Sequence, residues 1–236
     1  MVKRHLIRLN SPKAWPVKRK GLRFITRSNP GAHSLKTSMP LNLIIKDMLK
    51  LAPTTQEVRK ILQNKEVMVN KVVRRDKKFP VGFMDVVELP KIKVAYRMLY
   101  NKSGKFMLKE IDVKEAAVRP CQIKNKSITK KGKVQLHLND GSNWLVDNKD
   151  YKVNDTVVLN TQDKKIVGHL PFEKGSIIII MGGNKVATLG VLKGIRSFKS
   201  SQPDDVIFTN KDGEFETKKK YAMVIGKEKP VIELED

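Results

Sequence analysis

Residues 41–73, LNLIIKDMLKLAPTTQEVRKILQNKEVMVNKVV, combine three local signals of structure. Apolar residues recur at helical spacing over residues 41–52, and a proline ends that pattern. Thr54 and Glu57 then form a T-x-x-E capping box, which predicts the start of a second helix. Valines on both sides of Asn70-Lys71 predict a tight hairpin, because Asn tolerates a left-handed backbone. The stretch therefore predicts two helices followed by a short β-hairpin.

Short strands and turns are expected from residue 80 to the end of the chain. Pro80 to Gly82 predicts a turn, and residues 84–89 predict a strand. One short helix is expected near Lys114. Turns are predicted at Ser103-Gly104, Lys131-Gly132, Asp140-Gly141 and Asp212-Gly213, and late strands at 177–181, 221–225 and 231–234. Most of the chain is therefore predicted to be β.

The net charge of the chain indicates which class of partner it binds. The chain has 48 Lys and Arg against 24 Asp and Glu, a formal charge of +24. Such an excess favours a polyanion, because binding neutralises the repulsion and releases counterions. Nucleic acid is favoured over an acidic membrane surface, since no basic amphipathic helix of the membrane-surface type stands out. The longest apolar stretch is also far shorter than a bilayer-spanning helix requires. The single cysteine, Cys121, excludes a disulfide framework and indicates a reducing compartment.

Residues 1–40 form a distinct basic segment. They contain no Asp or Glu, and four prolines prevent a long helix. Trp15, Leu22, Phe24 and Ile25 are interleaved with the cations, a pattern in which aromatic rings stack on bases while cations contact phosphates. An RNA-ordered arm is therefore favoured over a solvated tail. For the two histidines of the segment, His5 and His33, phosphate contact is expected rather than catalysis.

No catalytic or metal-binding set is predicted. None of the four histidines has metal-ligand spacing, and no Ser/His/Asp set has spacing support. The loop Gly182 to Lys185 lacks the Walker pattern. It is open to two interpretations, a backbone loop that approaches an RNA phosphate or a β-turn that needs positive φ. We expect no cofactor.

Several motifs in order resemble one family, the archaeal and eukaryotic type of small-subunit ribosomal protein number four. The motif Phe79-Pro80-Val81-Gly82-Phe83-Met84-Asp85-Val86 is highly specific to it. Further matches are His5 to Leu9, Pro12 to Trp15, Pro30 to His33, Lys152 to Thr156 and Val224 to Lys227. Eukaryotic members commonly carry a basic tail after the position of Leu234. This sequence shows no such tail, which favours an archaeal source.

The resemblance implies an α+β multidomain fold with four parts. These are a basic extended N-terminal arm (1–40), a small αL RNA-binding α/β domain (41–90), a central β domain (91–172) and a C-terminal KOW-containing SH3-like β-barrel (173–236). Signature glycines of the KOW module would be Gly175, Gly183 and Gly190.

The implied function is that of a structural constituent of the small ribosomal subunit in the cytoplasm. The expected partners are small-subunit rRNA and neighbouring ribosomal proteins, with no membrane and no small-molecule substrate. Two alternatives stay open, an RNA-modifying enzyme and a transient translation or transcription factor built from the same modules. Such an enzyme would need a further catalytic domain with an Asp in an Arg-x-Asp loop; no such motif is recognised, and the β domains look too small. A transient factor would not need so long an acid-free arm.

Candidate RNA-binding residues fall in three groups. The arm would supply Lys3, Arg4, His5, Arg8, Lys13, Trp15, Lys18, Arg19 and Lys20. The αL domain would supply Arg59, Lys60, Lys65, Lys71, Arg74, Arg75 and Lys77. The glycine loop would supply Gly183, Asn184 and Lys185.

Overall fold

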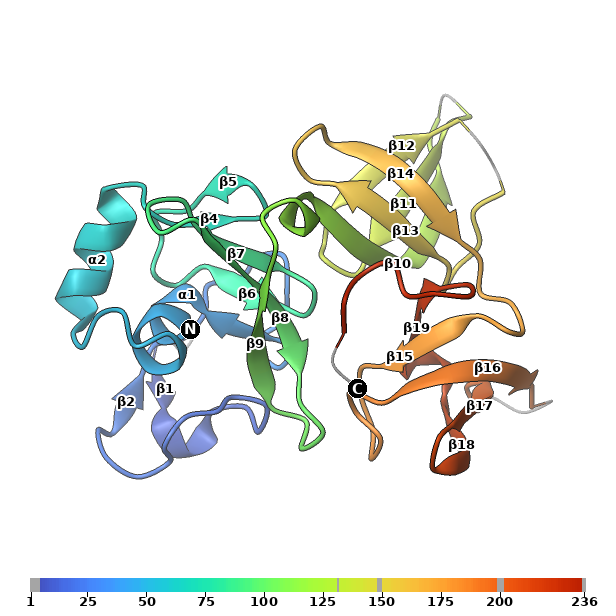
Figure 1. The fold of residues 1–236 in the computed structure, drawn as a ribbon, viewed down its shortest axis with the longest axis horizontal. Helices are drawn as coiled ribbons and strands as arrows, with labels where there is room; N and C mark the ends of the chain where they lie inside the picture. The colour runs from blue at the N-terminus through green and yellow to red at the C-terminus, as the bar shows by residue number, and fades with distance from the viewer. Residues whose placement is uncertain (1–4, 131, 148–149, 199–201, 235–236) are drawn as a thin grey trace. The chain divides into compact units, whose positions relative to one another are not determined.

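The protein is described by a computed structural model that covers residues 5–130, 132–147, 150–198 and 202–234 (Figure 1). The chain divides into two compact units, residues 1–119 and 120–236. Both are mostly β, with few helices. No helix within the described ranges is long and apolar enough to cross a membrane.

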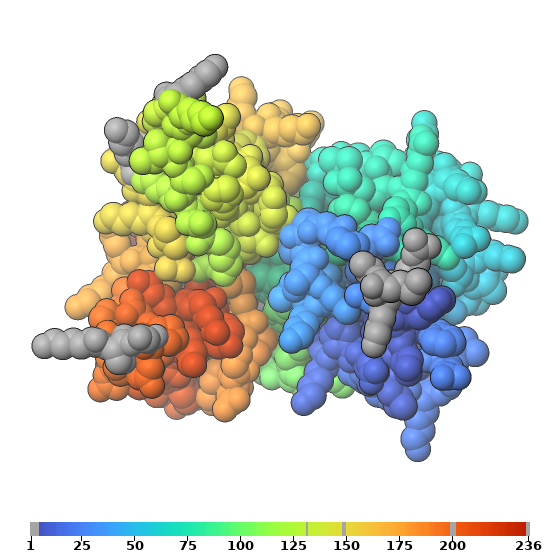
Figure 2. Space-filling model, turned by 180° about the vertical axis from the view of Figure 1, so that it is seen from behind, coloured from blue at the N-terminus to red at the C-terminus, as the bar shows by residue number. Residues whose placement is uncertain are grey.

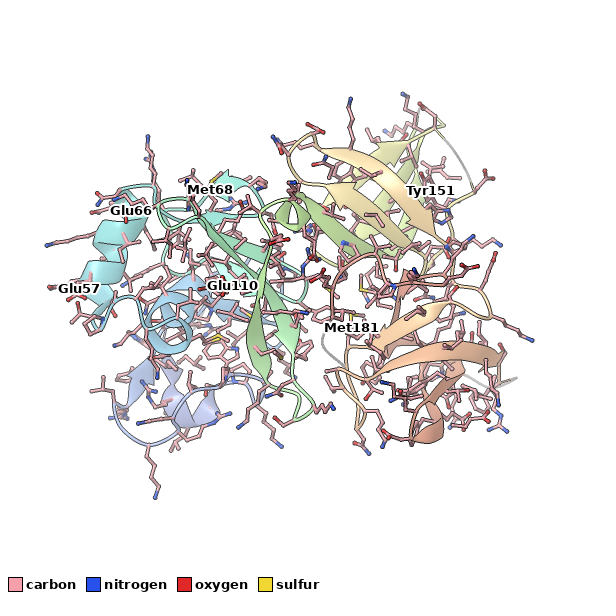
Figure 3. The ribbon with its side chains drawn as sticks, in the orientation of Figure 1. Glu57, Glu66, Met68, Glu110, Tyr151 and Met181 are labelled. Carbon is pink, nitrogen blue, oxygen red and sulfur yellow. The ribbon has the colours of Figure 1, made fainter. Side chains whose placement is uncertain are left out.

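The two predicted helices of the first unit are confirmed. The first runs from α1 (Leu41–Leu43) into a π-helical turn, η2 (Ile44–Met48). The second is α2 (Thr55–Gln63), and the Thr54 hydroxyl accepts a hydrogen bond of 3.3 Å from the Glu57 amide at its start. Figure 3 labels Glu57 at this end of the helix. Val58 and Leu62 are fully buried, so α2 packs on the core through one stripe and leaves the rest of its surface to solvent.

A five-stranded antiparallel sheet supports these helices. Its order is β5-β4-β7-β8-β9, made of β4 (Met68–Val69), β5 (Val72–Val73), β7 (Val86–Leu89), β8 (Val94–Tyr100) and β9 (Phe106–Ile111). Asn70 and Lys71 connect β4 to β5 with φ of 52° and 63°, as the hairpin prediction requires. The domain boundary expected at residue 90 falls inside this sheet. Strand β7, which precedes residue 90, is hydrogen-bonded to β8, which follows it.

The prediction of a turn at Pro80–Gly82 was wrong. These residues form strand β6, which pairs with β3 (Ser38–Pro40). Local sequence could not reveal this pairing, because the partner strand lies about forty residues earlier in the chain.

The N-terminal segment is folded onto the first unit, not extended from it. Strands β1 (Leu6–Ile7) and β2 (Phe24–Ile25) pair, and the 3-10 turn η1 (Arg8–Asn10) follows β1. Trp15 is 1% exposed and shares one hydrophobic core with Met39, Ile44 and Leu62. In Figure 2 the blue atoms of this segment lie against the cyan and teal elements of the same unit. For residues 5–40, the prediction of an extended arm is therefore corrected.

The second unit contains two five-stranded antiparallel sheets. The first has the order β12-β11-β10-β13-β14, made of β10 (Val118–Ile128), β11 (Val134–Leu138), β12 (Asn143–Val146), β13 (Thr156–Asn160) and β14 (Lys165–Leu170). The second has the order β18-β17-β16-β15-β19, made of β15 (Ile177–Ile180), β16 (Leu189–Arg196), β17 (Asp205–Asn210), β18 (Gly213–Lys218) and β19 (Ala222–Gly226). Each sheet has its own apolar core.

The remaining local predictions have mixed outcomes. A 3-10 turn, η3 (Glu115–Ala117), lies where a short helix was expected, and η4 (Lys219–Tyr221) precedes the last strand. The strand predicted over 231–234 is wrong. Within the described part of this tail, β pairing is limited to a single bridge between Gly226 and Pro230.

Candidate nucleic-acid interface

The outward face of α2 carries exposed cations. Arg59 and Lys60 lie beside the buried stripe of Val58 and Leu62, and both side chains are exposed. Lys65 follows the helix with φ of 59° and is also exposed. All three cations are therefore accessible from solvent.

The loop before β6 adds further cations to the same region. Burial lowers the pKa of Lys77, and the neighbouring charges of Arg59 and Lys78 lower it further. Like charges from α2 and from this loop are therefore close enough to repel one another. Among the described residues, the charge of Asp76 acts in the opposite direction and raises the pKa of Lys77. A polyanion would relieve the repulsion.

The arginines of this loop have different surroundings. Arg75 is exposed, whereas Arg74 is half-buried and its guanidinium lies 4.3 Å from the centre of the Phe79 ring. The tripeptide Arg74-Arg75-Asp76 has the Arg-x-Asp pattern of an RNA-modifying enzyme's catalytic loop, so the expectation that the chain lacks this pattern is corrected. The Asp76 carboxylate accepts hydrogen bonds from the Lys78 amide and the Asn29 side chain, so it braces its own loop.

Lys71 differs from the other candidate cations. Its ammonium lies 2.7 Å from the Glu88 carboxylate and is only 19% exposed. The ion pair links the β4–β5 hairpin to β7 across the sheet. Lys71 therefore has an intramolecular partner in place of the free charge that the sequence suggested.

The candidate residues of the N-terminal segment fall into three classes. Lys3 and Arg4 lie outside the described residues. The exposed side chains, for which phosphate contact stays a prediction, are His5, Lys13, Lys18 and Lys20. The guanidinium groups of Arg8 and Arg19 donate to backbone carbonyls within the segment, at 2.6 to 3.5 Å, so both arginines brace its fold.

The prediction that Trp15 stacks on a base is corrected. Its indole Nε1 donates a hydrogen bond of 2.7 Å to the Ser38 carbonyl, and its ring is buried in the core. The exposed aromatic ring of this segment is Phe24, which is 52% exposed. The Arg23 guanidinium lies 5.4 Å from the Phe24 ring centre and the His5 ring lies 5.6 Å away. The interleaved pattern contained both rings, but it did not distinguish the buried one from the exposed one.

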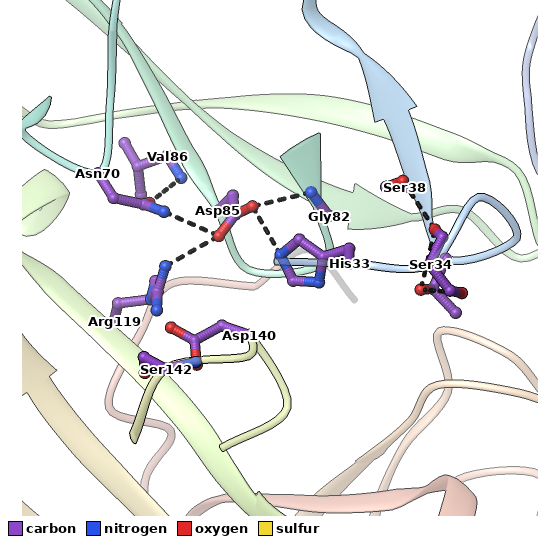
Figure 4. Close-up of polar contacts among 11 residues, drawn as sticks. His33, Ser34, Ser38, Asn70, Gly82, Asp85, Val86, Arg119, Asp140 and Ser142 are labelled. Carbon is purple, nitrogen blue, oxygen red and sulfur yellow. Dashed lines mark hydrogen bonds and ion pairs between the residues drawn. The ribbon is translucent and has the colours of Figure 1, made fainter. Parts of the chain in front are cut away.

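The expectation that His33 contacts phosphate is also corrected. Its Nε2 lies 2.9 Å from Oδ2 of Asp85, and both side chains are buried (Figure 4). Asp85 also accepts hydrogen bonds from the Gly82 amide, the Asn70 side chain and the Arg119 guanidinium. Burial by itself would raise the pKa of Asp85, but the His33 hydrogen bond and the charges of His33 and Arg119 lower it to about 2.

The glycine loop of the second unit combines backbone constraint with exposed polar groups. Gly183 has φ of 87°, and Asn184 and Lys185 are exposed. The Lys185 ammonium lies 4.1 Å from the centre of the Phe215 ring. The positive φ of Gly183 confirms the turn interpretation. The exposed Lys185 is available to a phosphate, and that contact stays a prediction.

A serine, a histidine and an asparagine form a hydrogen-bonded chain in the second unit. The Ser127 hydroxyl lies 2.9 Å from Nε2 of His137, whose Nδ1 lies 2.7 Å from the Asn143 side-chain oxygen. No spacing in the sequence indicates this set, because its members meet only through pairing of β10, β11 and β12. Across the described ranges no three His, Cys, Asp or Glu residues could hold a metal ion.

Comparisons with known proteins cover almost the whole chain. Three family models match: the RS4NT (NUC023) domain over residues 2–36, the S4 domain over 39–87 and Ribosomal family S4e over 92–166. A protein of Methanocella arvoryzae named small ribosomal subunit protein eS4 is 37% identical and the match covers 97% of both chains. A protein of the same name from Archaeoglobus fulgidus is 38% identical, and the match covers 99% of both.

A solved structure supports the same relationship. The crystal structure of the 30S ribosomal protein S4e from Thermoplasma acidophilum matches with a TM-score of 0.70 and 31% identity. The match covers 80% of this chain and 95% of that one.

Proposed function

The chain belongs to the ribosomal S4e family, and from this we propose that it is a structural, non-catalytic constituent of the small ribosomal subunit. It binds and stabilises small-subunit rRNA in the cytoplasm, beside neighbouring ribosomal proteins. The observation that carries this proposal is near full-length identity of 37–38% to archaeal proteins named as small-subunit components.

The αL domain is proposed as the main RNA-docking surface. Its candidate contacts are Arg59, Lys60, Lys65, Arg75 and Lys77, with Arg74 in a partly buried position. The mutual repulsion at Lys77 supports this choice, because each phosphate that enters the region removes an unfavourable interaction. Recognition depends mainly on RNA shape, since the deep major groove of A-form RNA hides base edges from side chains.

The N-terminal segment is proposed to present a preformed surface to RNA. Its exposed groups are His5, Lys13, Lys18 and Lys20, with the Phe24 ring beside them as a stacking surface. Because the segment already packs on the core, RNA binding carries less ordering entropy than it would for a free arm.

The last sheet is proposed to be a KOW-type barrel within residues 173–236. Three glycines fit the backbone demands of such a module. Gly175 and Gly183 have positive φ, and a side chain at Gly190 would lie 2.6 Å from the Phe208 ring. Lys185 and Asn184 would then contact an RNA phosphate. The other proposed parts are 1–40, 41–90 and a central β domain over 91–172.

Sedimentation of the tagged protein from a cell lysate tests this function. On sucrose gradients at low and then high salt, an integral component stays with small subunits in both. Release at modest salt would favour a transient factor instead. A protein that runs free at both salt concentrations would overturn the proposal.

A further inference from the structure

A groove of about 740 Å³ lies in the first unit, lined by residues 27–35 and by Lys78. This volume is within the range of small-ligand sites in proteins. The surrounding residues include two cations, polar side chains and the apolar surfaces of Pro30, Ala32 and Leu35. None of these described lining residues carries a carboxylate.

The groove contains a buried hydroxyl without a partner. Ser28 is 8% exposed, and its Oγ makes no hydrogen bond within the described structure. A buried polar group in this state is unfavourable in the isolated protein, and a ligand that hydrogen-bonds to it removes that penalty. Ser28 also lines the groove, so rotation of its side chain about χ1 would bring this hydroxyl to a polar ligand bound there.

The two cations give the groove a positive charge. Arg27 and Lys78 both contribute to its lining. The charge of Lys78 also acts on Lys77, so the groove adjoins the cation cluster that includes Arg59. An anionic polymer bound at that cluster is thus within reach of the groove.

The wall of the groove is rigid at His33. The ring is held by its bond to Asp85, and it also packs against Gly82, where an added Cβ would lie 2.5 Å from the ring. The His33 ring cannot move towards Gly82 and enlarge or close the site. The groove is therefore preorganised for its ligand.

We propose that this groove binds one unpaired nucleotide of rRNA. The phosphate contacts Arg27 and Lys78, the Ser28 hydroxyl hydrogen-bonds to the base or ribose, and the base lies on the apolar surface of Pro30 and Leu35. Unpaired nucleotides are the usual targets of sequence-specific RNA recognition, because their base edges are accessible. This inference rests on the proposed rRNA-binding function and deepens it.

Three variants of the full chain test the proposal. Ser28→Ala removes the hydroxyl, Ala32→Trp fills the groove without changing charge, and Lys78→Gln removes one cation. The matched controls are Lys36→Gln, an exposed lysine of the same segment outside the groove, and Ser197→Ala, an exposed hydroxyl in the other unit. Filter binding to a small-subunit rRNA transcript at fixed salt measures affinity, and thermal unfolding checks the fold.

The expected result has a specific signature. Ser28→Ala lowers affinity about three- to tenfold, as loss of one hydrogen bond predicts, and leaves thermal stability unchanged or higher. Ala32→Trp and Lys78→Gln lower affinity more than either control. Photo-crosslinking with rRNA that contains 4-thiouridine maps to residues 27–35, and Ala32→Trp suppresses this crosslink.

The outcomes separate this proposal from the general function. If the wild type binds rRNA but all three variants match the controls, the groove proposal is overturned and the function stands. Normal rRNA affinity with defective assembly of Ala32→Trp into subunits would point to a protein partner in the groove, which also overturns it. If the wild type fails to bind small-subunit rRNA, both proposals fall.

Discussion

Replacing Asp85 by Asn tests the buried network that joins the N-terminal segment to the first sheet. Each carboxylate oxygen of Asp85 accepts two hydrogen bonds, from Arg119 and Asn70 on one side and from His33 and the Gly82 amide on the other. An asparagine side chain at this position would have to turn its own NH₂ group towards donors on one of these sides. The substitution also removes the negative charge that faces the buried Arg119 guanidinium.

The magnitude follows from the pKa of Asp85, which is lowered from 3.8 to about 2. At about 1.4 kcal/mol for each pKa unit, ionised Asp85 stabilises the fold by about 2–3 kcal/mol. The pKa is lower in the folded state, so this contribution is complete above about pH 4 and is lost as the pH falls towards 2. Breaking a buried ion pair by removing one partner costs about 3–5 kcal/mol, so we expect Asp85→Asn to lose about 3 kcal/mol at pH 7.

Urea unfolding followed by circular dichroism measures both effects. Asp147→Asn serves as the control, because its carboxylate is 85% exposed and pairs with the exposed Lys133. Exposed pairs contribute about 0–1 kcal/mol. The difference in unfolding free energy between wild type and Asp85→Asn should shrink as the pH falls from 4 to 2. Equal stability at pH 7, or a difference independent of pH over this range, would refute the reasoning.

Three further results are expected. The double charge reversal Arg59→Glu and Lys60→Glu should weaken rRNA affinity and flatten its dependence on salt in filter binding; an unchanged slope would remove both residues from the interface. Trp15→Ala should lower the free energy of unfolding by about 3–5 kcal/mol in urea titrations, whereas a detached arm would tolerate it. Gly190→Ala should lower the melting temperature by several degrees because its Cβ would overlap a buried ring, while Gly194→Ala, where nothing lies within 4 Å, should change it little. Similar melting temperatures for the two glycine variants would contradict that packing.

Local signals predicted the elements that local interactions determine. The Thr54 hydroxyl satisfies the backbone amide of Glu57, three residues later, so the start of this helix could be predicted directly from the sequence. The turn at Asn70 and Lys71 is likewise a property of two residues with positive φ. In both cases the stabilising partners are close in the sequence.

The errors occurred where the partner is distant in the sequence. Trp15 bonds to a carbonyl 23 residues away, and His33 bonds to a carboxylate 52 residues away. An acid-free segment rich in cations and proline suggested solvent and RNA as its surroundings. The composition of a segment does not show which of its aromatic rings will be buried, so the burial of Trp15 could not be predicted.

The candidate site was predictable only in part. The sequence identified the cations of the αL domain by type and position, but it could not show that Lys71 pairs with Glu88. Nor could it reveal the groove beside Ser28, because residues 27–35 and Lys78 are brought together by the strand pairing of β3 with β6.

The network around Asp85 also determines the order in which the chain can fold during synthesis. A growing chain makes the N-terminal segment first, yet His33 meets its partner only after 52 more residues, and Arg119 is added 34 residues later still. Until then the basic, partly apolar segment has no complete core to pack on. Nascent chains of this protein therefore expose residues 5–40 while most of the first unit is translated, which makes this segment the natural target for any factor that protects it before assembly.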